Sequence, residues 1–117
     1  MSSVERFEDL RIWQEARTLA NQVYTETREL TDFTFRDQAR SAAISIMNNI
    51  AEGFERGTDA DFARFLDIAK GSSGEIRSML HLAEDLGYVS SGQAGEMRSG
   101  AGHLSAGIAT FAKYLRR

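Results

Sequence analysis

Apolar residues recur with the 3.6-residue period of an α-helix through most of this chain, and no stretch alternates as a β-strand would. The sequence contains no proline, the residue that most strongly interrupts a helix. The periodic segments predict four long helices, at residues of about 8–30, 36–54, 59–86 and 91–115. The segments between them are short, which makes consecutive helices antiparallel. We therefore expect an all-α fold, an antiparallel up-down-up-down four-helix bundle formed by residues 1–117 as a single domain.

Polar residues and glycine mark several of the predicted helix ends. Thr58 or Asp59 is a suitable N-cap for the third helix, and Ser90 or Ser91 for the fourth. Gly87 stands where a left-handed glycine commonly ends a helix. The fourth helix is the least well specified, since it contains several glycines, each of which lowers helix propensity by up to about 1 kcal/mol relative to alanine.

The stretch AKGSSGEIR, residues 69–77, raises the question whether glycine and serine interrupt the third helix or bind a phosphate. At roughly 100° per residue, the apolar face continues through this stretch without a change of phase. A phosphate-binding glycine loop would precede a helix, usually after a strand. The stretch is thus predicted to be helical. Its small residues are expected to form a patch that another backbone can approach closely, made of Gly71, Ser72, Ser73 and Gly74.

The composition limits the chemistry that is open to this chain. The absence of cysteine excludes disulfides, thiolate metal sites and a cysteine nucleophile. The net charge is −3, from 14 basic and 17 acidic residues, whereas proteins that bind the phosphate backbone are usually basic. No apolar run approaches the length of a membrane span, and residues 1–9 are charged rather than signal-like. We expect a soluble, cytoplasmic protein with no membrane partner.

The predicted helices carry more apolar surface than a single bundle core requires. The second helix is apolar over roughly 200° of its circumference, about twice the width typical of a surface helix, and the first and third are similarly broad. Surplus apolar surface favours self-association, although a small bundle with an unusually apolar central helix would have the same pattern. The partner that this pattern indicates is another copy of the chain.

Charged residues also lie on the apolar sides of two predicted helices. Arg40 lies on such a side of the second helix and Glu75 on such a side of the third. Because a charge that faces a core has to be paired or hydrogen-bonded, we expect the two to meet, either within the bundle or across a subunit contact. A separate polar stripe on the second helix consists of Gln38, Ser45, Asn49, Glu52 and Arg56. The stripe has two interpretations: it is either a ligand-binding groove, or a structural feature such as a solvated edge or an inter-helix hydrogen-bond network.

Motifs for catalysis or metal binding are weak or missing in this sequence. His81, Glu84 and Asp85 have a helical spacing that could hold a metal, but a solvated histidine that forms salt bridges has the same spacing. There is no nucleophile elbow, nucleotide-binding glycine loop or convincing carboxylate pair. The basic run KYLRR, residues 113–117, could contact RNA or complement the negative end of a helix. We expect no enzymatic activity, no cofactor and no metal.

A larger set of residues carries a resemblance to a known family. The set comprises FEDLRIWQEA at residues 7–16, Gln38, Arg40 and Ala42, the segment SIMNNIAEGFERGTDADFARFLDIAKGSSGE at residues 45–75, and LAEDLGYV at residues 82–89. In these segments the chain resembles the four-helix-bundle proteins encoded within intervening sequences of bacterial large-subunit ribosomal RNA genes, the 23S rRNA intervening-sequence proteins. It departs from them at Met47, where proline is common, at Ser73, where an apolar residue is frequent, and in the first inter-helix loop, which lacks the usual proline.

The resemblance implies a left-handed antiparallel bundle that assembles as a ring-shaped homopentamer, with no established enzymatic activity. Relatives include the accessory variability proteins of diversity-generating retroelements, basic pentamers that bind a reverse transcriptase and nucleic acid; the acidic balance of this chain argues against that mode of binding. Two functions remain, a homo-oligomeric assembly protein or an accessory factor that associates with RNA, DNA or a ribonucleoprotein. The residues expected at structural or interface positions are Arg40, Ser45, Asn49, Glu52, Gly53, Arg56, Gly71, Ser72 and Glu75.

Overall fold

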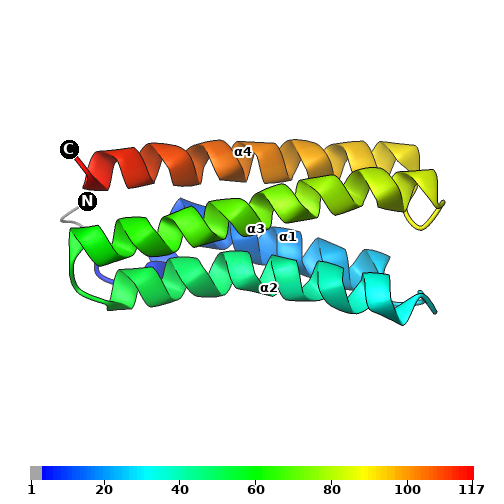
Figure 1. Ribbon diagram of the computed structural model, residues 1–117, viewed down its shortest axis with the longest axis horizontal. Coiled ribbons are helices and arrows are strands. Elements are labelled where there is room, and N and C mark those ends of the chain that lie inside the picture. The colour runs from blue at the N-terminus through cyan, green and yellow to red at the C-terminus, as the bar shows by residue number, and fades with distance from the viewer. Residues whose placement is uncertain (1–3) are drawn as a thin grey trace.

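The computed structural model describes residues 4–117, so residues 1–3 of the charged N-terminal stretch lie outside the described part. Its elements are η1 (Phe7–Asp9), α1 (Arg11–Glu26), α2 (Phe33–Glu55), α3 (Asp59–Asp85) and α4 (Ser91–Leu115). Consecutive helices run antiparallel and form the all-α, up-down-up-down four-helix bundle that the sequence predicts (Figure 1). The bundle is elongated, with extents of 44 × 20 × 20 Å. Within residues 4–117, no helix is both long enough and apolar enough to span a membrane.

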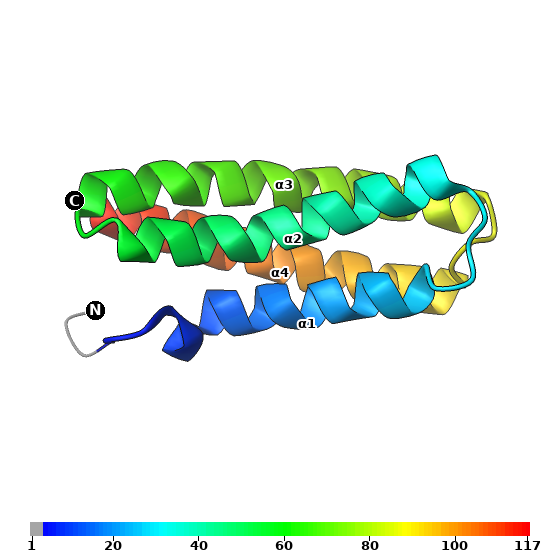
Figure 2. The same ribbon diagram turned by 90° about the horizontal axis from the view of Figure 1, so that it is seen from below.

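Each helix of the bundle packs against two others. α2 lies between α1 and α3, and α4 lies between α3 and α1, so that α1 and α3 occupy diagonal corners (Figures 1 and 2). α3 makes the most extensive contacts, with α2 on one flank and α4 on the other, whereas α1 packs more lightly on its two neighbours. The α1–α2 and α3–α4 connections lie at one end of the bundle, and the two chain ends lie at the other (Figure 1).

Side-chain caps determine where three of the four helices begin. Asp32, Thr58 and Ser90 each accept a hydrogen bond from the backbone N–H three residues later. Of the alternatives left open by the sequence, Thr58 and Ser90 are therefore the N-caps, rather than Asp59 and Ser91. Such caps satisfy backbone donors that have no partner within the helix and typically contribute about 1 kcal/mol.

Gly87 ends α3 in the left-handed conformation that its position predicts, with a φ of +74°. The N–H of Tyr88 donates to the carbonyl of Ala83 at 2.8 Å, and the N–H of Gly87 donates to that of Glu84 at 3.1 Å. This pair of bonds satisfies the last carbonyls of α3 and turns the chain toward α4.

The predicted bounds of the first helix are too wide. The helix covers Arg11–Glu26 instead of about 8–30. It starts late because residues 7–9 form a 3-10 turn and Leu10 is extended, with a ψ of 128°, and it ends early because residues 27–29 form a turn. α2 starts at Phe33, earlier than the predicted residue 36, because Asp32 caps it. The predicted starts of α3 and α4 are correct, and the predicted ends of α2, α3 and α4 are correct to within one residue.

The core receives side chains from all four helices. Its largest fully buried side chains are those of Ile46, Ile50, Leu66, Ile76, Met97, Leu104 and Ile108. α4 is continuous across its glycines because Met97, Leu104 and Ile108 pack into this core. Gly107 has a packing reason of its own, since a Cβ at this position would lie 3.3 Å from the Cγ2 of Ile12 on α1.

Residues 69–77 are helical, as their apolar phase predicts. Ser73 is completely buried, and its Oγ donates to the carbonyl oxygen of Ala101 on α4 at 3.0 Å. The expectation of a close approach is wrong for Gly71 and Gly74, because a Cβ on either would have no atom within 4 Å. These two glycines face outward, and the close contact to α4 is made by Ser73.

Candidate functional site

A shallow polar groove runs between α2 and α3 and includes several of the sequence-predicted site residues. Its volume is about 310 Å³, and its lining residues are Gln38, Ser41, Ala42, Ser45, Ser72 and Glu75. Gln38, Ser41 or Ala42, and Ser45 follow one another at steps of three or four residues, which keeps them on the flank of α2 that faces α3. The fold thus places the polar stripe of α2 beside a serine and a glutamate of α3. We call this feature the α2–α3 groove.

The polar side chains of the α2–α3 groove hydrogen-bond to one another. Ser45 Oγ lies 2.8 Å from Ser72 Oγ and accepts from Asn49 Nδ2 at 3.0 Å. Gln38 Nε2 donates to Glu75 Oε2 at 3.0 Å. Within residues 4–117, no buried side-chain nitrogen or oxygen lacks a partner. The inter-helix hydrogen bonds that one interpretation of the polar stripe predicts are therefore present, between Ser45 and Ser72 and between Gln38 and Glu75.

Glu52 and Arg56, at the end of the predicted stripe, lie apart from this network. They form an ion pair at 3.0 Å, with side chains that are 55 % and 47 % exposed. The Arg56 guanidinium also lies 4.9 Å from the ring centroid of Phe65 on α3. An exposed pair at this helical spacing contributes roughly 0.3–0.5 kcal/mol, so these residues make a surface contact rather than a binding site.

Gly53 has a structural role at the crossing of α2 and α3. A Cβ at this position would lie 2.7 Å from the Cβ of Phe65 and 2.9 Å from the Cδ1 of Phe62. Both distances are shorter than the contact distances of carbon atoms. The residue is therefore glycine because the two phenylalanines of α3 occupy the space beside it.

Arg40 and Glu75 do not meet within the bundle, and this form of the sequence-based prediction is wrong. Arg40 Nε donates to Thr27 Oγ1 at 3.0 Å, and the guanidinium lies 4.3 Å from the centroid of the Tyr24 ring. Glu75 instead accepts the bond from Gln38 described above. The physical reason is angular, because residues 38 and 40 point about 200° apart on one helix. On α2, Arg40 therefore points toward α1, whereas Gln38 points toward α3, where Glu75 lies.

Large apolar side chains are exposed on both sides of α2. The exposed fraction is 40 % for Tyr24 and 57 % for Phe33, and it is 46–50 % for Ile68, Leu82 and Leu86. These values agree with the surplus of apolar surface that the helical patterns predict. We define two surfaces from them. The α1–α2 face consists of Trp13, Tyr24, Phe33, Arg40, Ile44 and Met47, and the α3 strip consists of Ile68, Glu75, Leu82 and Leu86.

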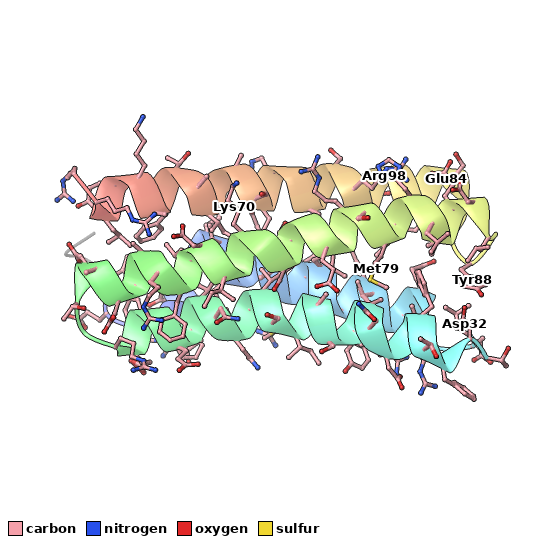
Figure 3. The ribbon with its side chains drawn as sticks, in the orientation of Figure 1. Asp32, Lys70, Met79, Glu84, Tyr88 and Arg98 are labelled. Carbon is pink, nitrogen blue, oxygen red and sulfur yellow. The ribbon has the colours of Figure 1, made fainter. Side chains whose placement is uncertain are left out.

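The opposite flank of α3 is joined to α4 by ion pairs that the sequence did not predict. Arg98 donates to Glu84 at 2.7 Å (Figure 3). Arg116 donates to both carboxylate oxygens of Asp67, at 2.6 and 3.1 Å. The hydrogen bond from Arg98 holds the pKa of Glu84 below its usual range, and that from Arg116 does the same to the pKa of Asp67. Glu84, one of the three metal-ligand candidates, is thus paired with an arginine. Within residues 4–117, no three acidic, histidine or cysteine side chains lie close enough together to hold a metal ion.

Asp32 and Tyr88 join the two connections at one end of the bundle (Figure 3). The Tyr88 hydroxyl donates to Asp32 Oδ2 at 2.7 Å. This bond, together with the N–H of Phe35, holds the pKa of Asp32 below its usual range, and the same bond raises the pKa of Tyr88. The two residues are 56 positions apart, and no local pattern in the sequence indicates their contact.

The chain is similar to a known protein family and to a solved structure. The family model of the 23S rRNA-intervening sequence protein matches residues 8–110. A similar solved structure is that of a protein with unknown function from the S23 ribosomal protein family of Bacteroides thetaiotaomicron. It superimposes with a TM-score of 0.80 at 21 % identity, over 87 % of this chain and 98 % of that one. None of the curated protein sequences matches this chain. The solved structure supports the fold.

Proposed function

This chain belongs to the 23S rRNA-intervening sequence protein family, and on that premise we propose that it is a non-enzymatic assembly protein that forms a ring of identical copies. The resemblance described above leads us to expect five copies. The polar groups of the α2–α3 groove support a structural role, because they bond to one another across the helix pair.

The observation that carries this proposal is the exposure of large apolar side chains on two sides of one helix pair. On the α1–α2 face, Phe33 is 57 % exposed and Tyr24 is 40 % exposed. On the α3 strip, Ile68, Leu82 and Leu86 are 46–50 % exposed. Removing apolar surface from water contributes roughly 25 cal/mol per Å². A standard interface takes about 800 Å² from each partner, and a bundle of 44 × 20 × 20 Å offers side faces of that size. Two contacts per copy would cover these surfaces.

The test is the native mass of the purified protein by light scattering, read with absorbance at nucleic-acid and protein wavelengths. We expect a particle of about 65 kDa, five times the chain mass of 13.0 kDa, with the absorbance ratio of a bare protein. A monomer would overturn the proposal.

Excess nucleic-acid absorbance in the same sample would favour the alternative function, an accessory factor of a ribonucleoprotein. That function requires binding that weakens steeply with salt, because each phosphate contact releases a counterion. The net charge of −3 and the pairing of Arg98 and Arg116 with carboxylates disfavour it. A salt titration with labelled RNA and DNA therefore accompanies the mass measurement.

A further inference from the structure

We propose that the copies associate head to tail, with the α1–α2 face of one copy on the α3 strip of the next, and with Arg40 opposite Glu75. This inference rests on the proposed self-assembly and specifies its contact. The two surfaces differ, so the contact is heterologous, the type that forms a ring when the rotation between neighbours closes and an open filament when it does not.

Charge is the first reason to join unlike surfaces. Arginines cover aromatic rings of the α1–α2 face: Arg17, beside this face, lies 5.6 Å from the Trp13 ring centroid, and Arg40 lies 4.3 Å from that of Tyr24. The α3 strip carries a carboxylate, Glu75, among its apolar residues. Among residues 4–117, the ion pairs include neither Arg40 nor Glu75. A contact between two α1–α2 faces would bring arginines toward arginines, whereas a head-to-tail contact brings Arg40 toward Glu75.

Height along the bundle is the second reason. Gln38 on α2 is hydrogen-bonded to Glu75 on α3, and Ser45 is hydrogen-bonded to Ser72, so the members of each pair lie at the same level. Since the rise is about 1.5 Å per residue, Arg40 lies within about 3 Å of the level of Glu75.

The same antiparallel register extends one heptad to either side of Arg40 and Glu75. Phe33 lies near the level of Leu82, and Met47 lies near the level of Ile68. A rotation about an axis parallel to the bundle leaves every residue at its own height. In such a ring each of the three residues on the α1–α2 face therefore meets its counterpart on the α3 strip of the next copy.

The angle between the two surfaces is the third reason. They lie on adjacent sides of a square bundle, which are roughly 90° apart. Neighbours of a copy are about 90° apart in a ring of four and about 108° apart in a ring of five. The geometry thus fits a small closed ring with α2 nearest its axis. The outermost side of α2, between the two surfaces, carries the exposed polar residues Asp37, Ser41, Asn48 and Glu55, which would line the centre.

Disulfide trapping tests this contact directly, because the natural chain contains no cysteine. The variants are Phe33→Cys, Leu82→Cys and the combination of both, at positions that are 57 % and 47 % exposed and so tolerate substitution. A disulfide requires Cα atoms within about 7 Å. After mild oxidation, we expect the double variant to form a ladder of covalent multimers on a non-reducing gel and each single variant to remain one chain.

The matched control is Leu82→Cys combined with Thr110→Cys, because Thr110 is exposed on α4, away from both surfaces. It should give no ladder, and circular dichroism checks that every variant keeps its helix content. Covalent dimers of either single variant would show that a surface meets its own copy and would overturn the proposal. An oligomeric wild type whose double variant gives no ladder would overturn the head-to-tail contact alone, whereas a monomeric wild type would overturn the proposed function itself.

Discussion

The two flanks of α3 are built differently. Toward α4, the flank carries charges that are paired within the chain, through Glu84 with Arg98 and Asp67 with Arg116. Toward α2, it carries exposed apolar side chains and a carboxylate, Glu75, whose partner is a neutral amide. One flank is complete in the single chain, and the other retains surface that a second molecule could bury. Because of this difference, we expect an intermolecular contact on the flank of α3 that faces α2.

Among the variants that compare the two flanks, charge reversal should have the largest effect, which is a loss of the assembly. Arg40→Glu and Glu75→Arg should each dissociate the proposed assembly, because like charges that face each other across a contact cost several kcal/mol. The double variant should reassociate, since it restores an opposite pair. Sedimentation over a range of protein concentrations measures the effect. Lys70→Glu, an exposed change on the α4 flank (Figure 3), is the control that should leave the mass unchanged. A double variant that stays dissociated would contradict the pairing.

Two glycine substitutions compare the packed inner surface with the outer surface of the bundle. Gly53→Ala should lower the free energy of unfolding by about 1–3 kcal/mol, because its Cβ has no space beside Phe65 and Phe62. Gly71→Ala should raise it by up to about 1 kcal/mol, because its Cβ meets open space within a helix. Urea titrations at one fixed protein concentration measure both. Equal effects of the two changes would show that α2 and α3 do not cross closely at Gly53.

Two adjacent serines compare the flanks at nearly the same level of α3. Ser73→Ala should lower the free energy of unfolding by about 1 kcal/mol, because Ser73 is fully buried and donates to the Ala101 carbonyl. Ser72→Ala should have a smaller effect, because Ser72 is half-buried and Ser45 keeps its bond from Asn49. Thermal unfolding of the two variants in parallel gives the difference. The reverse order would contradict the assignment of Ser73 to the α4 contact.

A pH series should give the smallest effect, on the α4 flank. The bond from Arg98 places the pKa of folded Glu84 below that of the unfolded chain, which is about 4.3 for glutamate. The pair therefore contributes stability above that value and loses it as the pH falls through the lower, folded pKa. Glu84→Gln should melt below the wild type at pH 7, and the two melting temperatures should converge at acid pH. A constant gap at every pH would exclude this linkage.

The parts of the fold that depend on local chemistry were predictable. Helical periodicity predicted four helices and the continuity of residues 69–77, and the caps at Thr58 and Ser90 were among the expected residues. Gly87 adopts the left-handed conformation that its position indicated. These features depend on residues within a few positions of one another, so the local sequence is sufficient to predict them.

The contacts between helices were less predictable. The angular position of Arg40 and of Glu75 on their helices was apparent, but not which neighbour each faces, and the bundle separates them. Gly53 and Gly71 have the same intrinsic helix propensity, and only the packing of α3 against α2 distinguishes them. The bond from Tyr88 to Asp32 joins two connections that are far apart in the chain. Such contacts depend on the relative placement of whole helices.

The two ends of the bundle are unlike, since one holds both chain ends and the other holds the bond between Asp32 and Tyr88 (Figures 1 and 3). In a ring of the proposed kind every copy points the same way, so all chain ends emerge on one rim. A domain fused to either terminus would be displayed in several copies on that rim, and the opposite rim would stay free. The two rims of such a ring would therefore differ, and each could bind a different partner.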